Sequence, residues 1–210
     1  MMKFSRDKID NLRQRVGERL SEKRFLHTLG VEKMALYIGE KIMPERLSEL
    51  SVAALLHDIS KEYSEAEHKN AAKRHNISMS EEDISSPQLW HSITACAAVL
   101  DDFSEYATED ILSAVTNHTT GSPDMSDFDS IILLSDYIEE GRKYPNCVSL
   151  REAFLRELDS ARTLEERIYA LDRAVYISLD NNIKEFISRG VSYHTRTKAT
   201  RDAFWAKITR

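Results

Sequence analysis

Two kinds of side chain that bind divalent metals, imidazoles and carboxylates, recur along this chain at wide intervals. They are His27, the adjacent pair His57 and Asp58, His91, His118 and Asp136. Each lies in an apolar segment, where a buried imidazole or carboxylate is costly unless it has a partner, and a metal ion is one such partner. The pattern therefore predicts a metal-dependent hydrolase.

Helical spacing places these six side chains on apolar faces. Residues three or four apart share a helix face. His27 shares one with Val31, and His118 shares one with Val115. The simplest interpretation of a lone inward histidine is a hydrogen-bonded core residue. Six such side chains, including an adjacent histidine–aspartate pair, favour metal ligands instead.

The number of candidate ligands predicts two ions. The ligands of a first ion, with positions left for water and substrate, are His27, His57, Asp58 and Asp136. His91 and His118 would hold a second ion beside it, and Asp58 is the expected bridge because a carboxylate has two oxygens. Two adjacent ions activate a bridging water and neutralise a phosphoryl group. Mixed histidine and carboxylate ligation without cysteine favours iron, with manganese as the alternative, over structural zinc.

Cationic side chains near these ligands predict phosphate contacts. Lys61 follows Asp58 by one helical turn, and these two are the predicted catalytic residues; the alternative for Lys61 is a helix-end lysine favoured by the macrodipole. Arg24 and Arg142 offer guanidinium forks that match phosphate oxygens, and a surface ion pair is the alternative for each.

One turn offers further candidate substrate contacts, whereas the three remaining histidines are not candidates for the site. Thr119, Thr120 and Gly121 are candidate substrate-binding residues with hydroxyl and amide donors, and a simple helix stop is the alternative. The sequence surrounding His68, His75 and His194 is polar, so a solvated face is predicted for all three.

Composition limits the class of protein to which these residues belong. The 210-residue chain has 41% hydrophobic residues, enough for one domain with a core, and a formal net charge of −6, which argues against a general nucleic-acid binder. Two cysteines make no disulfide framework. We expect a cytoplasmic protein without membrane association, because the chain shows neither a signal-peptide apolar region nor 18 consecutive apolar residues.

The elements that must position the ligands are all predicted to be helices. The expected ranges are 5–16, 19–42, 46–60, 64–75, 88–101, 106–118, 127–139 and one or two helices over 149–189. No segment alternates as a strand would. The sequence therefore predicts an all-α fold, with a single domain over 1–190 and a tail over 191–210 that packs on it.

Several motifs resemble one known family. The ligand order histidine, histidine–aspartate, histidine, histidine, aspartate resembles that of the HD superfamily of metal-dependent phosphohydrolases. More narrowly, five segments look like those of the YqeK-like HD-domain family: 24–31 (RFLHTLGV), 54–61 (ALLHDISK), 118–126 (HTTGSPDMS), 135–142 (SDYIEEGR) and the ending 190–201. These segments span most of the chain.

The resemblance implies an HD-domain helical bundle with a di-iron centre. It also implies a hydrolase acting on phosphoanhydride bonds, which cleaves diadenosine tetraphosphate symmetrically to two ADP. Two alternatives remain open: a broader nucleotide phosphohydrolase, and a non-catalytic regulator that is stabilised by metal and only binds a nucleotide. The expected partner is a nucleotide substrate and not a nucleic acid, and the sequence leaves a homodimer open.

Overall fold

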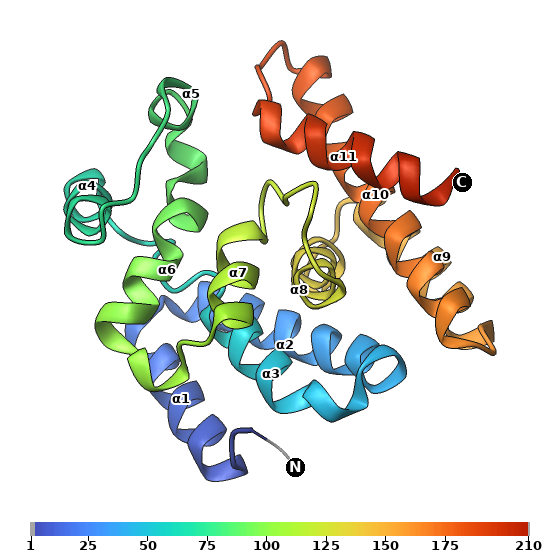
Figure 1. Cartoon of the computed structure of the whole chain (residues 1–210), viewed down its shortest axis with the longest axis horizontal. Coiled ribbons are helices and arrows are strands. Elements are labelled where there is room, and N and C mark those ends of the chain that lie inside the picture. The colour runs from blue at the N-terminus through green and yellow to red at the C-terminus, as the bar shows by residue number, and fades with distance from the viewer. Residues whose placement is uncertain (1–2, 210) are drawn as a thin grey trace.

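Helices make up the regular secondary structure of the protein, for which a computed structural model describes residues 3–209 (Figure 1). Over that range there is no strand, and the predicted all-α fold is confirmed. Met1, Met2 and Arg210, which the predicted domain and tail include, lie outside the described residues. None of the described helices combines the length and apolar character needed to cross a bilayer.

The first half of the chain supplies seven described helices. They are α1 (Arg6–Arg19), α2 (Glu22–Ile42), α3 (Leu47–Leu56), α4 (Glu65–Arg74), α5 (Glu81–Ile84), α6 (Trp90–Asp102) and α7 (Glu109–Asn117). Helix α2 packs on α3, α6 packs on α7, and α3 contacts both α1 and α7. These contacts bring the carboxyl-terminal ends of α3 and α7 toward one region.

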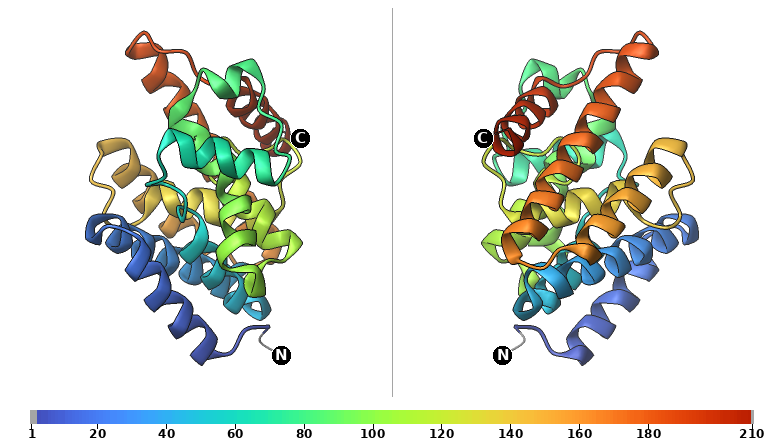
Figure 2. Two further views of the ribbon diagram at one scale, coloured as in Figure 1. Left: turned by 90° about the vertical axis from the view of Figure 1, so that its left-hand side faces the viewer. Right: turned by 90° about the vertical axis from the view of Figure 1, so that its right-hand side faces the viewer.

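The second half supplies four helices. They are α8 (Asp127–Ile138), α9 (Pro145–Ser160), α10 (Leu164–Ser188) and α11 (Thr195–Ile208). Helix α10 packs against α8, α9 and α11, and α8 also contacts α2 and α7. Figure 2 shows α1 to α3 at one end of the molecule and α5, α11 and the end of α10 at the other.

Two helices lie at the centre, and both are mainly apolar and buried on all sides. In α3 every residue from Ser48 to Leu56 is buried, and in α8 every residue from Phe128 to Ser135 is buried. A helix without a polar face has to be surrounded by other elements. Helix α8 is seen end-on in the middle of Figure 1. Side chains that follow the apolar run of either helix are thus held inside the molecule.

Local capping decides where several helices begin. Ser126 forms a capping box with Asp129 at the start of α8, and Thr163 forms one with Glu166 at the start of α10. Each box satisfies backbone N–H groups that the first helical turn leaves free. The Thr163 box explains why the predicted region 149–189 forms two helices. A third box at Ser80 produces the short α5, which was not predicted.

Helix α3 ends earlier than predicted. Its last residue is Leu56, so His57, Asp58 and Lys61 lie in the turns that follow. The prediction that Lys61 shares a helix face with Asp58 is therefore wrong. The ammonium of Lys61 still lies 3.8 Å from Asp58 Oδ1, because a tight turn, closed by the hydrogen bond from the Lys61 N–H to the Asp58 carbonyl oxygen, brings the two residues together.

The predicted solvated positions of His68 and His194 are also wrong. His68 is buried under α6, with Nδ1 2.7 Å from the hydroxyl oxygen of Thr94. His194 is buried at the start of α11, with Nε2 3.0 Å from Asp83 Oδ1. The polar residues next to each histidine in sequence led to the prediction of a solvated face, but residues distant in sequence cover both rings. His75 stays partly exposed beside Asp101.

Candidate metal centre

The six predicted ligands converge from five places in the fold. His27 lies in α2, His57 and Asp58 follow α3, His91 lies in the first turn of α6, His118 follows α7, and Asp136 lies in the last turn of α8. Four of these five places are at or just beyond a helix end. Polar side chains at such ends can approach one another because no helical backbone stands between them.

The ligand atoms form two compact groups. In each, the atoms lie within 4.8 Å of one another; one comprises His27, His57 and Asp136, and the other Asp58, His91 and His118. The predicted grouping had Asp58 with His27, His57 and Asp136, whereas the structure groups it with His91 and His118; the other five residues are grouped as predicted. Three ligands per group leave coordination positions for water or substrate.

Asp58 lies between the two groups. Its Oδ1 lies 3.5 Å from His91 Nε2 and 3.5 Å from His118 Nε2. Its Oδ2 lies 3.5 Å from His57 Nε2 and 3.9 Å from His27 Nε2. One oxygen thus faces each group, which is the arrangement that a bridging carboxylate requires.

Hydrogen bonds orient three of the imidazoles. His57 donates from Nδ1 to the carbonyl oxygen of Ala54, and His118 donates from Nδ1 to that of Val115, each over 2.7 Å. His27 Nδ1 lies 3.1 Å from Glu139 Oε1. In all three rings Nε2 is left for the site, as in histidines that bind metal with one nitrogen and are held by the other.

Two buried atoms in the centre have no hydrogen-bond partner within the described residues. They are His57 Nε2 and Asp58 Oδ1, whereas His27 Nε2 lies 2.9 Å from Asp136 Oδ1. Buried polar atoms are nearly always satisfied in native proteins. Divalent cations would satisfy both at once, so the donor set fits such ions. Nitrogen and oxygen donors without cysteine match a transition metal with open positions.

Electrostatics keep the carboxylates ionised. Burial raises the pKa of Asp58, but His57, His118 and Lys61 outweigh it and hold that pKa well below its ordinary value. Burial likewise opposes the effects of His27 and Arg142 on Asp136, whose pKa is also held well below the ordinary value. Both side chains are therefore anionic, the form that binds a metal.

The imidazoles differ in their charge. Burial, with Lys61 and His118 nearby, lowers the pKa of His91, which is therefore neutral. Burial also lowers the pKa of His27, but the carboxylates of Asp136 and Glu139 outweigh it and raise the value to about 9. Without metal, His27 holds a proton at neutral pH, and an incoming metal ion has to displace it.

The predicted phosphate-binding cations lie at the edge of the centre. Arg24 donates to Asp58 Oδ2 over 2.8 Å, and Arg142 donates to Asp136 Oδ1 over 2.6 Å. Lys61 Nζ lies 2.8 Å from His91 Nε2. Each is bonded to a candidate ligand and each is only partly exposed. Three cationic side chains thus lie beside the metal ligands.

The predicted turn contributes one residue to the centre. The hydroxyl of Thr119 lies 3.2 Å from His91 Nε2. Thr120 is buried, and its hydroxyl bonds the carbonyl oxygen of Gly121. Gly121 has a φ of +66°, and a Cβ there would lie 2.6 Å from Thr200 of α11. The structure therefore brings Thr119 to the centre, while Thr120 and Gly121 end the helix and pack on the tail.

Glu139 was not predicted from the sequence. It is buried, accepts a hydrogen bond from the backbone N–H of Gly141 and faces His27. Its neighbour Glu140 is exposed and pairs with Lys33. The sequence has no signal that separates these two glutamates. In the structure the carboxylate of Glu139 lies close to two glycines: a Cβ would lie 2.5 Å from Glu139 Oε2 at Gly30 and 2.8 Å from both carboxylate oxygens at Gly141.

The chain is similar to one protein family and to several named proteins. Residues 24–171 match the HD domain family. Proteins named symmetrical bis(5'-nucleosyl)-tetraphosphatase are similar: that of Bacillus subtilis is 30% identical over 70% of this chain and 77% of its own, and that of Halalkalibacterium halodurans is 31% identical over 70% and 78%. The Staphylococcus aureus protein of that name is 26% identical over 90% of each chain.

A solved structure from Clostridium acetobutylicum is similar over the whole fold. It is described as a predicted HD superfamily hydrolase involved in NAD metabolism, and it is 29% identical with a TM-score of 0.80. The similarity covers 99% of this chain and 100% of that one.

Proposed function

This chain belongs to the HD domain family, and from that premise we propose that it hydrolyses dinucleoside polyphosphates, cleaving diadenosine tetraphosphate symmetrically to two ADP. The observation that carries the proposal is the pair of three-ligand groups with Asp58 between them. The names of three relatives that are symmetrical tetraphosphatases support the substrate. As a member of this family the chain is a hydrolase that binds divalent metal.

We propose that the six side chains hold two ions, one in each group, and that iron is the metal, with manganese able to replace it. The absence of cysteine from both groups supports this choice over structural zinc. When bound, such a pair of ions lowers the pKa of water and offsets the charge of a phosphoryl group.

The remaining chemistry belongs to side chains of this protein. Asp58 holds the two groups together through its two oxygens. Arg142 uses Nε and one terminal nitrogen to hold Asp136, which leaves its other terminal nitrogen free to donate to phosphate. Arg24 has free donors in the same way, and the Lys61 ammonium and Thr119 hydroxyl complete the proposed contacts. Together they would orient the phosphate chain and offset charge on the departing ADP.

We also propose that the HD domain over 1–190 and the tail over 191–210 form one folded unit. Supporting this, α11 packs along α10, and its Phe204 is fully buried. The contact of Gly121 with Thr200 joins the tail to the turn beside the metal centre. In Figure 2 the loop that starts the tail projects with the end of α10, and α11 then lies back against the remainder of the molecule.

Product analysis tests the proposed reaction. Metal-loaded protein is mixed with diadenosine tetraphosphate, and an early time point is separated by nucleotide chromatography. Symmetrical attack yields ADP alone, whereas equal AMP and ATP would mean asymmetrical attack. Tight binding without turnover would favour the regulator instead. His75→Ala is the matched control for ligand substitutions, because His75 pairs with Asp101 away from the centre and should leave turnover unchanged.

A further inference from the structure

Two cavities of nearly equal volume flank the metal centre. One, of about 850 Å³, is lined by His118 and Asp136. The other, of about 840 Å³, is lined by His27. Both reach Arg142 and Tyr144, which therefore stand where the two meet. The metal centre thus opens on two spaces and not on one.

Each cavity has the volume of an ordinary small-molecule site. A dinucleotide cleaved in the middle of its phosphate chain carries one nucleoside on each side of the reacting phosphates. The metal centre with a cavity on either side offers the matching arrangement. This step rests on the proposed function, because it takes the reacting phosphates to lie at the centre.

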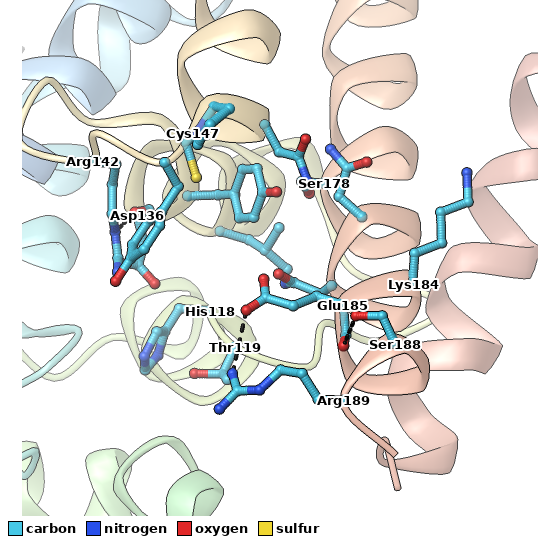
Figure 3. A pocket seen from close by; sticks show the side chains of 17 residues that line it. His118, Thr119, Asp136, Arg142, Cys147, Ser178, Lys184, Glu185, Ser188 and Arg189 are labelled. Carbon is cyan, nitrogen blue, oxygen red and sulfur yellow. Dashed lines mark hydrogen bonds and ion pairs between the residues drawn. The ribbon is translucent and has the colours of Figure 1, made fainter. Parts of the chain in front are cut away.

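The wall of the first cavity on α10 is polar and carries both charged and uncharged side chains. Figure 3 shows His118, Asp136 and Arg142 on one side, with Ser178, Lys184 and Glu185 opposite them. We name this space, bounded by α7, α8, α9 and α10, the α10 cavity.

Side-chain amides distinguish the α10 cavity. Asn181 and Asn182 of α10 and Asn146 of α9 line it, and Tyr137 lies against Asn181. An amide donates and accepts at adjacent atoms, which matches the neighbouring acceptor and donor on an adenine edge.

The second cavity is lined mainly by charged side chains. It lies between α2 and the residues after α8, and we name it the α2 cavity. Its charged lining includes Glu22, Lys23, Arg24, Glu62 and Glu140, and among its lining residues there is no side-chain amide. Carboxylates accept hydrogen bonds from ribose hydroxyls, and the cations attract phosphate. Ribose and phosphate are common to every nucleotide, so this lining does not distinguish bases.

We propose that the two halves of the dinucleotide are recognised differently, with Asn181 in the α10 cavity selecting one base and the α2 cavity accepting any nucleoside. The reaction would then be symmetrical, because both products are nucleoside diphosphates, although only one of the two cavities selects its base. One adenine is sufficient for recognition, and the second contributes little.

Three substrates test the asymmetry: diadenosine tetraphosphate, its mixed adenosine–uridine analogue and its diuridine analogue. The mixed compound should have about half the kcat/KM of the diadenosine compound, since only one of its two orientations is productive. The diuridine compound should be about tenfold poorer, the loss expected when a base-reading hydrogen bond is unmade. Equal rates for all three, or a mixed compound as poor as the diuridine one, would overturn the proposal.

Substitution of the amide locates the selection. Asn181→Ala should remove most of the preference for adenine and leave diuridine turnover nearly unchanged. Alanine favours the helix, so α10 should still form. Asn181→Asp keeps an acceptor but removes the donor, and it should also lose the preference. Asn70→Ala is the matched control, because Asn70 is an exposed asparagine in α4. Preference retained in both Asn181 variants would contradict the assignment.

A binding measurement separates this proposal from the proposed function. Calorimetry with ADP and UDP should show tighter binding of ADP to the unsubstituted protein, and Asn181→Ala should remove the difference. If no dinucleotide is hydrolysed but this difference is present, the proposed reaction fails and base selection stands. If dinucleotides are hydrolysed but ADP and UDP bind equally, base selection fails and the reaction stands.

Discussion

At the scale of single residues, the imidazoles of the metal centre are supported in two different ways. His57 and His118 are held by backbone carbonyl oxygens three residues earlier, which the end of a helix supplies whatever the side chains are. His27 is held by Glu139, a side chain from another element. A carboxylate also adds negative charge, which makes the imidazole a stronger ligand. Of these three supports, only the one on His27 can be removed by a single substitution.

Glu139→Gln tests that support. The variant keeps the shape of the side chain but removes its charge, so His27 should become a weaker ligand. We expect metal affinity to fall by about 10- to 100-fold, measured by competition with a coloured chelator. The direct control is Glu140→Gln, which removes the same charge one residue away on the surface. An equal loss of metal affinity in both variants would mean that any lost negative charge has this effect, and it would contradict the specific support of His27 by Glu139.

The apolar-face positions of the six ligand candidates could be predicted from residue types and helical spacing, because these depend on local sequence. Their convergence depends on how the helices pack, and the resemblance to the HD superfamily implied it. Glu139 could not be predicted, since its burial depends on α2 and α8 meeting at Gly30. His68 and His194 show the same limit, as their partners Thr94 and Asp83 are distant in sequence. The amides of the α10 cavity were missed for that reason too.

At the scale of elements, the helices were predicted closely and their ends less so. Apolar periodicity and capping residues are local signals, and they predicted α6 and α8 within two residues at either end and α2 within three. The end of α3 was misplaced by four residues, because the apolar pattern continues through Ile59 although the backbone turns after Leu56. That turn allows His57 and Asp58 to face the centre together.

The crossing of α2 and the end of α8 depends on a glycine. Gly30→Ala should stabilise α2 by up to about 1 kcal/mol through helix propensity, but its Cβ would displace the Glu139 carboxylate. We therefore expect thermal unfolding of the metal-free variant to be little changed, while the increase in Tm on adding manganese becomes smaller. Unfolding curves with and without a chelator measure both quantities. An unchanged metal-dependent increase would show that Glu139 tolerates the methyl group.

At the scale of the whole molecule, one central helix joins the site to the remainder of the fold. Helix α8 contacts α2, α3, α7, α9 and α10, and it carries Asp136 in its last turn. The ligands thus belong to the same core that stabilises the domain. Contacts between the C-terminal tail and the middle of the chain add to this, since His194 meets Asp83 of α5 and Thr200 of α11 meets Gly121. Loss of the tail is therefore expected to affect the site as well as stability.

The central claim is that the molecule holds two metal ions bridged by Asp58, and metal content per chain tests it most directly. Elemental analysis of anaerobically purified protein should give two ions for the unsubstituted chain and close to none for Asp58→Ala, whereas His118→Ala should keep the ion of the His27 group. Circular dichroism should show that all three proteins are folded. Two tightly bound ions in folded Asp58→Ala protein would contradict the account.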